Sequence, residues 1–318
     1  MGRSFKGNTG VVSPKRDSFR DTDMKKKALF IFNPHAGKGQ IKTRLLDVVD
    51  KLTKDGYDVT VHPTQSRGDA VTVVSESAGE YDLCVCSGGD GTLDEVVTGM
   101  MRTDVRIPIG YLPTGSTNDF ANSLKIPKKA SAAIEAAVHG RPFLCDIGRF
   151  NDDVFVYIAA FGLFTDVSYE TRQEMKNIFG HMAYILEGMT RLSSIKSYNV
   201  TVTADGKKFE GDYLYGMVTN SHSVGGFQNI TGKNVELDDG LFEVTLIKRP
   251  RNVVELNQIA AALIGGRFDT QQMNSFKAAD IIFETKEAVP WTLDGEFGGE
   301  HRRVKVHNEH HALRFLVP

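Results

Sequence analysis

A glycine-rich turn between an apolar strand and an amphipathic helix constrains this chain more than any other feature. The apolar run 81–86 leads into Ser-Gly-Gly-Asp-Gly-Thr-Leu-Asp-Glu at residues 87–95, and apolar residues then recur at helical spacing. Such a unit directs backbone N–H groups and the positive helix end at one point, which suits a phosphate. Asp90 repels that phosphate unless a metal ion or a set of donors lies between them. The segment therefore predicts a nucleotide triphosphate with Mg²⁺, although Gly-Gly-Asp-Gly alone fits a tight turn with an Asp helix cap equally well.

The composition predicts a two-domain globular protein and excludes some classes. The chain has 318 residues, 41% hydrophobic and 25% charged. Its net charge of −2 argues against a nucleic-acid-binding protein, and no apolar stretch approaches the ~20 residues of a transmembrane segment. Cys84, Cys86 and Cys145 show no metal-binding spacing, so we expect buried free thiols and a cytoplasmic location.

Residues 1–26 differ from the rest, because basic and acidic residues alternate there with almost nothing apolar. The segment lacks the apolar core of a secretory signal. We expect it to be a disordered leader, most of it added before a natural start at Met24.

From residue 27 onward, strand and helix patterns alternate. The expected strands are 28–32, 59–61, 81–86 and 107–112, and the expected helices are 41–52, 69–78, 93–100, 118–124 and 130–139. This order predicts a doubly wound α/β domain over residues 27–142, with a parallel sheet. The loops 33–39, 87–92 and 113–119 then emerge at the carboxyl ends of strands, where such sheets bind ligands.

Past Pro142 the pattern becomes rich in β-forming residues. The expected strands are 154–161, 199–204, 207–213, 214–220, 242–248, 279–284 and 304–307, interrupted by helices near 170–194 and 252–264. This pattern predicts an antiparallel β-sandwich over residues 143–307. Residues 308–318 include a last apolar strand that we expect to return to the first domain.

Two further motifs carry polar chemistry. Pro-Thr-Gly-Ser-Thr-Asn-Asp-Phe at 113–120 offers hydroxyls and a carboxylate, although capping explains these residues when they are taken alone. Trp-Thr-Leu-Asp-Gly-Glu-Phe at 291–297 is first of all a hairpin turn. It also presents Asp294 and Glu296 together, and phosphoryl transfer to an alcohol needs a base for the hydroxyl proton. Asp294 suits that base and Glu296 suits a partner.

Together the three motifs resemble, in order and spacing, the soluble diacylglycerol kinase family of bacterial lipid kinases, from about Lys27 to the C-terminus. The segments 33–37, 64–70, 161–171 and 220–227 are also similar to that family. The resemblance implies an NAD kinase/diacylglycerol kinase-like α/β domain followed by a β-sandwich domain that binds the lipid. It implies an ATP-dependent lipid kinase that transfers the γ-phosphate to the hydroxyl of diacylglycerol and yields phosphatidic acid, with ATP and Mg²⁺ as cofactors.

The resemblance also implies roles for matching positions. Asp90, Asp119 and Asp146 form a carboxylate–water–Mg²⁺ network around the transferred group, and Asp294 is the general base with Glu296 beside it. The residues assigned to ATP are Asn33, Pro34, His35, Ala36, Gly37, Thr64, Gly88, Gly89, Asp90, Gly91, Thr92, Leu93, Asp94, Glu95 and Ser116.

A second, structural Mg²⁺ site is implied at the loop 236–241, through the carboxylate of Asp239 and the carbonyls of Glu236 and Leu241. An Asp-Gly hairpin explains the same residues. Asp94 stands where the family usually has Asn, so its own contact stays open.

Other patterns are interpreted more plainly. The histidines of 306–311 indicate a solvated turn rather than a zinc site. The apolar stripe 178–192 indicates core more than membrane contact. Residues 37–39 do not form a Walker A loop.

Three alternative functions stay open. They are a kinase for another lipid alcohol (of the sphingoid-base or phosphatidylglycerol type), an NAD kinase, and a non-catalytic nucleotide sensor. The expected partner is a lipid substrate at a membrane surface, met by transient association. The sequence does not fix the oligomeric state, and a homodimer stays open.

Overall fold

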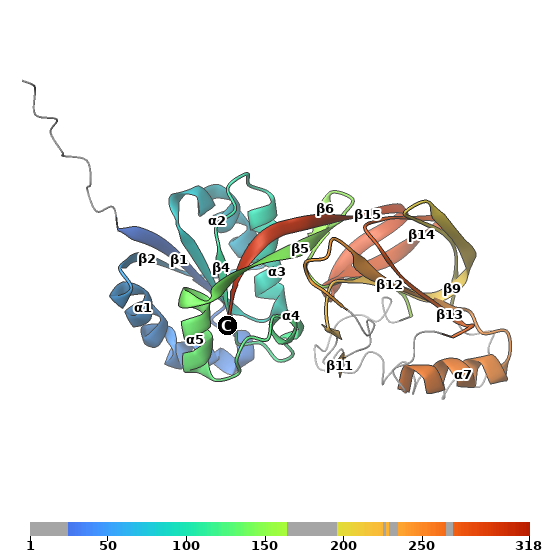
Figure 1. The fold of residues 1–318 in the computed structure, drawn as a ribbon, viewed down its shortest axis with the longest axis horizontal. Helices are drawn as coiled ribbons and strands as arrows, with labels where there is room; N and C mark the ends of the chain where they lie inside the picture. Colours follow the sequence, from blue (N-terminus) through green and yellow to red (C-terminus); the bar gives the residue numbers. More distant parts are fainter. Residues whose placement is uncertain (1–24, 164–195, 225–226, 229–234, 265–269) are drawn as a thin grey trace, which may run out of the picture.

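Two lobes lie side by side, one built on parallel strands and the other on antiparallel ones (Figure 1). The computed structural model describes residues 25–163, 196–224, 227–228, 235–264 and 270–318. The leader up to residue 24 and the helix expected near 170–194 lie outside the described residues. No helix in the described ranges combines the length and apolar character that crossing a bilayer requires.

The first lobe has the predicted doubly wound architecture. Its parallel strands are ordered β4-β3-β1-β2, and they are β1 (Lys26–Phe32), β2 (Tyr57–Pro63), β3 (Leu83–Gly88) and β4 (Ile109–Pro113). Helices cover them in two pairs, α1 (Leu45–Lys54) with α5 (Ala130–His139) and α2 (Asp69–Ser77) with α3 (Asp90–Met101). Short helices η1 (Ala36–Thr43), η2 (Ala78–Glu80) and α4 (Asp119–Ser123) complete the lobe. The expected helix 41–52 thus begins as a 3₁₀ turn.

The second lobe is an antiparallel sheet structure, which confirms the predicted fold class. Its strands are β6 (Asp153–Phe155), β7 (Ile158–Gly162), β8 (Tyr198–Ala204), β9 (Lys207–Thr219), β10 (Ser223–Val224), β11 (Phe227–Gln228), β12 (Phe242–Lys248), β13 (Met273–Ala278) and β14 (Asp280–Leu293), with helix α7 (Val253–Ile264). The two strands expected at 207–213 and 214–220 are one strand. Within this strand Gly216 leaves space for the ring of Phe161 on the neighbouring strand β7, which a Cβ there would approach to 2.2 Å.

Two long strands join the lobes. Strand β15 (Glu296–Val317) pairs with β14, then antiparallel with β5 (Arg141–Phe150), and finally parallel with β4 through Phe315 and Leu316. Figure 1 shows β5 and β15 crossing together from one lobe to the other. Residues 307–311, interpreted above as a solvated turn, therefore lie inside a strand, with a bulge between Glu309 and Leu313. The predicted boundary at residue 142 falls near the start of β5.

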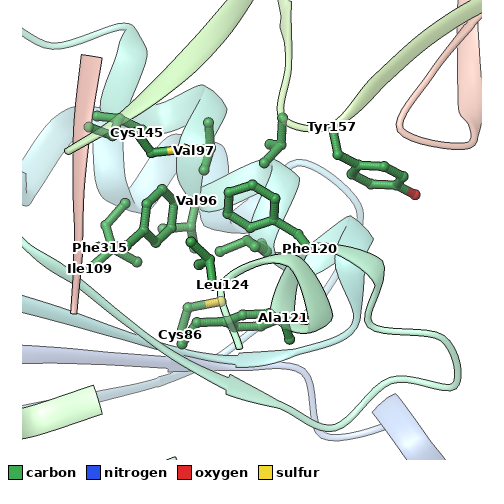
Figure 2. Close-up of a cluster of buried hydrophobic side chains, with 14 of the residues drawn as sticks. Cys86, Val96, Val97, Ile109, Phe120, Ala121, Leu124, Cys145, Tyr157 and Phe315 are labelled. Carbon is green, nitrogen blue, oxygen red and sulfur yellow. The ribbon is translucent and has the colours of Figure 1, made fainter. Parts of the chain in front are cut away.

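A hydrophobic cluster supports the region where the lobes meet (Figure 2). Phe120 of α4 packs edge-on against Phe315 of β15, with ring centroids 5.2 Å apart. Cys86 and Cys145 are fully buried in the same cluster, as expected for free thiols. Tyr157 lies at its edge in Figure 2. Helix α4 is therefore anchored to a strand that belongs to both lobes.

Candidate active site

The two glycine loops of the first lobe lie against each other. The N–H of Thr114 donates to the carbonyl of Gly88 over 2.8 Å. A Cβ on Gly115 would lie 2.5 Å from the Cα of Gly89, and one on Gly88 would lie 2.4 Å from the side chain of Thr92. Only glycine permits this approach of two backbones. The loops after β3 and β4 thus form one rim at the start of α3.

Asp90 connects these two loops. It is the first residue of α3, and its carboxylate accepts hydrogen bonds from the N–H groups of Asp119 (3.2 Å) and Phe120 (3.4 Å) at the start of α4. Asp119 in turn accepts a 2.5 Å hydrogen bond from the hydroxyl of Ser223, in the second lobe. Burial, and then the charge of Asp119, raise the pKa of Asp90 to about 7. Such a site favours a cation that offsets the paired negative charge.

Asp294 lies in the tight turn between β14 and β15. The predicted hairpin is present, with positive φ at both Asp294 (50°) and Gly295 (86°). The Asp294 carboxylate accepts hydrogen bonds from the backbone N–H groups of Val156 (2.5 Å), Tyr157 (2.9 Å) and Ile158 (2.9 Å). Burial raises its pKa to about 6, against the lowering effect of these three donors. The turn thus holds a buried carboxylate near neutrality.

Asp94, whose contact the sequence left open, lies within electrostatic range of that carboxylate. It lies one helical turn after Asp90 on α3, which packs against β6 and β15. Burial, and then the charge of Asp294, raise the pKa of Asp94 well above its usual range. The structure therefore brings Asp90, Asp94 and Asp119 of the first lobe together with Asp294 of the second.

Glu296 lies at the exposed rim of this site. Its carboxylate is 3.5 Å from the guanidinium of Arg67, with side chains that are 40% and 75% exposed. Glu95, assigned to ATP above, accepts hydrogen bonds from the N–H groups of Gly68 (2.8 Å) and Ala70 (3.2 Å), so it anchors the start of α2. Thr64, between β2 and that segment, donates its N–H to the carbonyl of Phe32.

The other residues assigned to ATP divide between loop and core. The N–H of His35 donates to the side chain of Asn33 over 2.9 Å, which closes a turn around Pro34 ahead of Ala36 and Gly37. Ser116 is exposed on the loop after β4. Leu93 is 1% exposed and belongs to the hydrophobic core, so only its backbone can face a ligand. Their assignment to ATP stays a prediction.

Asp146 makes its contacts away from Asp90 and Asp119. Its fully buried carboxylate accepts hydrogen bonds from the N–H groups of Gly240 (2.7 Å) and His311 (2.8 Å), and the ring Nδ1 of His310 lies 3.0 Å away. It therefore joins β5 to the loop 236–241 and to β15. Its membership of a network around the transferred phosphate stays a prediction.

The loop 236–241 has a carboxylate-rich environment. Asp239 accepts a 3.0 Å hydrogen bond from the N–H of Leu241 and pairs with the ammonium of Lys277 at 2.7 Å. Lys277 also lies 3.2 Å from Glu243, whose pKa is raised to about 7 by burial. Two carboxylates share one ammonium, so the donor set fits a divalent cation that takes oxygen ligands. Glu236 is exposed at the start of this loop.

Sequence reasoning missed the serines that join the lobes. The hydroxyls of Ser123 and Ser221 lie 2.8 Å apart, and the N–H of His222 donates to Ser123 over 3.1 Å. Ser223 holds Asp119, and Tyr157 donates its hydroxyl to the carbonyl of Asp294 over 3.2 Å. The segment 220–227 was noted for its resemblance only. Its polar run Thr-Asn-Ser-His-Ser at 219–223, between Val218 and Val224, was the available signal.

Comparisons with known proteins cover both lobes. A family model for the diacylglycerol kinase catalytic domain matches residues 27–150, and one for the YegS C-terminal NAD kinase beta sandwich-like domain matches residues 160–316. The diacylglycerol kinase of Bacillus subtilis (strain 168) is 36% identical over 277 residues, covering 86% of this chain and 91% of that protein. That of Staphylococcus carnosus (strain TM300) is 34% identical over 280 residues, covering 87% and 90%.

Solved structures share the fold. The crystal structure of a diacylglycerol kinase from Bacillus anthracis str. Sterne matches with a TM-score of 0.72 at 24% identity, covering 93% of this chain and 98% of that one. A second structure from the same strain matches with a TM-score of 0.78 at 23% identity and the same coverage. The two-lobe arrangement is therefore common to these proteins.

Proposed function

Since the chain belongs to the diacylglycerol kinase family, we propose that it transfers the γ-phosphate of ATP to the free hydroxyl of diacylglycerol, giving ADP and phosphatidic acid. One observation supports this proposal most directly. Asp90 of the first lobe, which accepts a hydrogen bond from the N–H of Asp119, lies close enough to Asp294 of the second lobe for the charge of Asp294 to raise its pKa. A phosphoryl group held by one lobe can therefore meet an acceptor held by the other.

The first lobe holds the nucleotide in this proposal. The backbone N–H groups at the start of α3 and the loop 113–119 bind the phosphates, because their glycines let the backbone approach closely. Asp90 and Asp119 would hold Mg²⁺, and the raised pKa of Asp90 marks a place where added positive charge is favourable. Mg²⁺, when bound, neutralises charge that develops on the transferred group.

Asp294 takes the proton of the acceptor hydroxyl. The O–H bond of the acceptor breaks as the new O–P bond forms. The bond between the γ-phosphorus and the bridging oxygen of ATP breaks at the same time and releases ADP. A base must be ionised beforehand. The three backbone donors favour the ionised carboxylate, while the pKa of about 6 leaves it basic enough to accept a proton.

A second Mg²⁺ is proposed at the loop 236–241. Asp239 would bind it through the carboxylate, together with the carbonyls of Glu236 and Leu241. Glu243 and Lys277 set the local charge, since two carboxylates face one ammonium. This site would stabilise the loop that contacts Asp146 through Gly240.

We also propose transient contact with a membrane surface, because the acceptor lies in a bilayer. Val253 and Val254 at the start of α7 are 60% and 65% exposed, next to exposed Lys248, Arg249 and Arg251. Exposed apolar residues flanked by basic ones suit an anionic bilayer surface. Replacing both valines with serine should lower sedimentation with anionic vesicles and leave turnover in detergent micelles unchanged. Leu46→Ser, on the exposed side of α1, is the matched control.

An acceptor panel tests the proposed function. Purified protein with radiolabelled ATP and Mg²⁺ is offered diacylglycerol, phosphatidylglycerol or sphingosine in mixed micelles, or NAD in solution. We expect labelled phosphatidic acid as the main product. Preference for another lipid or for NAD would reassign the acceptor, and no transfer to any acceptor despite nucleotide binding would favour a sensor. Light scattering of the same sample decides whether the protein is a homodimer.

A further inference from the structure

A small cavity lies in the first lobe, at the ends of β3 and β4, on the face of the sheet that α1 and α5 cover. Ser87 of β3 pairs in register with Leu112 of β4, and Thr114 follows two positions later, so strand alternation points these side chains to the same face. That face is the one toward α5, because a Cβ on Gly110 would lie 2.1 Å from the carbonyl oxygen of Ala137. The cavity therefore lies between the sheet and α5.

Two hydroxyl groups at this cavity have no hydrogen-bond partner among the described residues. Ser87 is 0% exposed and Thr114 is 3% exposed, and both side chains line the cavity. Buried polar groups are nearly always paired in folded proteins, because an unpaired one has lost its hydrogen bonds to water. The empty space, including its open mouth, is about 310 Å³, and about 20 Å³ admits the centre of a water molecule. The two hydroxyls thus face a space that suits a compact ligand.

The charge around the cavity is positive. Arg44, just before α1, and Lys128, just before α5, line it, and none of the residues that line it is acidic. Neither cation has an ion-pair partner in the part of the chain that the structure describes. Helix α5 also begins here: Ala130 lines the cavity, the N-cap residue Lys129 makes no capping hydrogen bond, and the first turn has no acid. The N-terminus of this helix therefore keeps its positive end for an anion.

We propose that this cavity is a binding site for a free, small oxyanion of the inorganic phosphate type. The hydroxyls of Ser87 and Thr114 donate to its oxygens, while Arg44 and Lys128 balance its charge at the mouth. The start of α5 adds the positive end of the helix. A metal ion does not fit the same place, because the cavity offers it two cations and no carboxylate.

The site lies on the opposite face of the sheet from the acidic cluster. Tyr111 precedes Leu112 on β4, so its side chain points away from the cavity, to the face where burial and then the charge of Asp90 raise its pKa. The two faces meet at the glycine loops, since the N–H of Thr114 donates to the carbonyl of Gly88. An anion held by Thr114 should therefore stabilise this loop contact. The inference does not depend on the proposed acceptor or base.

Calorimetric titration of inorganic phosphate into the full chain tests the site, with and without saturating MgADP and at constant ionic strength. We expect the wild type to bind phosphate in both conditions. The double variant Ser87→Ala/Thr114→Val should lose about tenfold or more in affinity, and so should Arg44→Gln. Lys54→Gln removes an exposed positive charge at the far end of α1 and is the matched control, so it should bind phosphate like the wild type.

Thermal unfolding separates lost binding from lost folding. Neither hydroxyl has a protein partner among the described residues, so the double variant should have a wild-type or higher Tm without phosphate. Phosphate should raise the Tm of the wild type, because a ligand of the native state stabilises it, and should leave that of the double variant unchanged.

Three results would overturn the inference. Equal phosphate affinity in the wild type and the double variant would place the anion elsewhere. No phosphate binding to the wild type would leave the two hydroxyls to water. Loss of phosphate binding on addition of MgADP would make the cavity part of the nucleotide site rather than a site for a free anion. A protein that binds phosphate but not MgADP would support this site while contradicting the proposed function.

Discussion

Two acidic clusters in this protein differ in how their charge is balanced. Asp239 and Glu243 of the second lobe share the ammonium of Lys277 at 2.7 and 3.2 Å. At the junction of the lobes, Asp90, Asp94 and Asp294 have no ion-pair partner among the residues that the structure describes. Lys277 partly neutralises the first cluster, so Asp239 and Glu243 form the balanced cluster. Asp90, Asp94 and Asp294 form the unbalanced cluster.

The difference indicates what each cluster does. An unbalanced buried carboxylate destabilises the fold unless hydrogen bonds or protons compensate it, and here backbone N–H groups donate to Asp90 and Asp294. The resulting pKa values, about 7 for Asp90 and about 6 for Asp294, lie close to neutrality. Buried carboxylates with pKa values near neutrality are typical of sites that bind ligands or transfer protons. The balanced cluster suits a structural role.

The largest effect is expected at the unbalanced cluster, from Asp294→Asn. Loss of the base should lower kcat by about 10³-fold, because general base catalysis is worth about 10²–10⁴-fold. Affinity for MgADP, measured by calorimetry, should change little. Asp280→Asn, an exposed acid at the start of the same strand β14, should keep wild-type turnover. Robust turnover by Asp294→Asn would refute the assignment.

Asp90→Asn tests whether the unbalanced cluster takes a cation. In the wild type, Mg²⁺ should strengthen ADP binding, and the variant should lose roughly 10–100-fold of that enhancement, as for residues that hold a metal ion through water. Calorimetric titrations with Mg²⁺ and with EDTA measure both affinities. If Mg²⁺ strengthened ADP binding equally in the two proteins, Asp90 would not contribute to Mg²⁺ binding.

The sequence predicted those parts of the site whose residues lie close together in the chain. The strand–glycine–helix unit around Asp90 is local, so its periodicity and turn chemistry identified it, and the Asp294 hairpin followed from Asp-Gly. The hydrogen bond from the N–H of Val156 to Asp294 joins residues 138 positions apart, and no spacing rule reports it. The bond from Ser223 to Asp119 is of the same kind.

The long strands show the same limit at the level of the fold. Hydrophobic alternation detected pieces of β15 at 304–307 and 315–317 but not its continuity through His310. Polar residues there signalled a turn, whereas they are satisfied by Asp146 from the neighbouring strand β5. A buried acid supplied by another strand reverses the expectation that polar residues lie in loops.

At the balanced cluster, Lys277→Met should affect stability rather than catalysis. Glu243 is 4% exposed, so the loss of its counter-ion should lower the free energy of unfolding by about 2 kcal/mol, less than for a fully buried pair because Lys277 is partly exposed. Denaturant titrations measure the change. The double variant Lys277→Met/Glu243→Gln should recover most of it. A kcat loss without a stability loss would place this cluster in the reaction instead.

The smallest effect is expected for the ion pair of Arg67 and Glu296, which spans the two lobes. Both side chains are largely exposed at 75% and 40%, and the closest atoms are 3.5 Å apart, so solvent screens the attraction. A double-mutant cycle of Arg67→Ala and Glu296→Gln should give a coupling free energy of about 0.5 kcal/mol or less in unfolding experiments, falling further at high salt. If Glu296 instead assists the base, Glu296→Gln should lower kcat even in the Arg67→Ala background. Coupling above about 1 kcal/mol would show that this exposed pair helps to hold the lobes together, in addition to buried contacts such as that of Ser223 with Asp119.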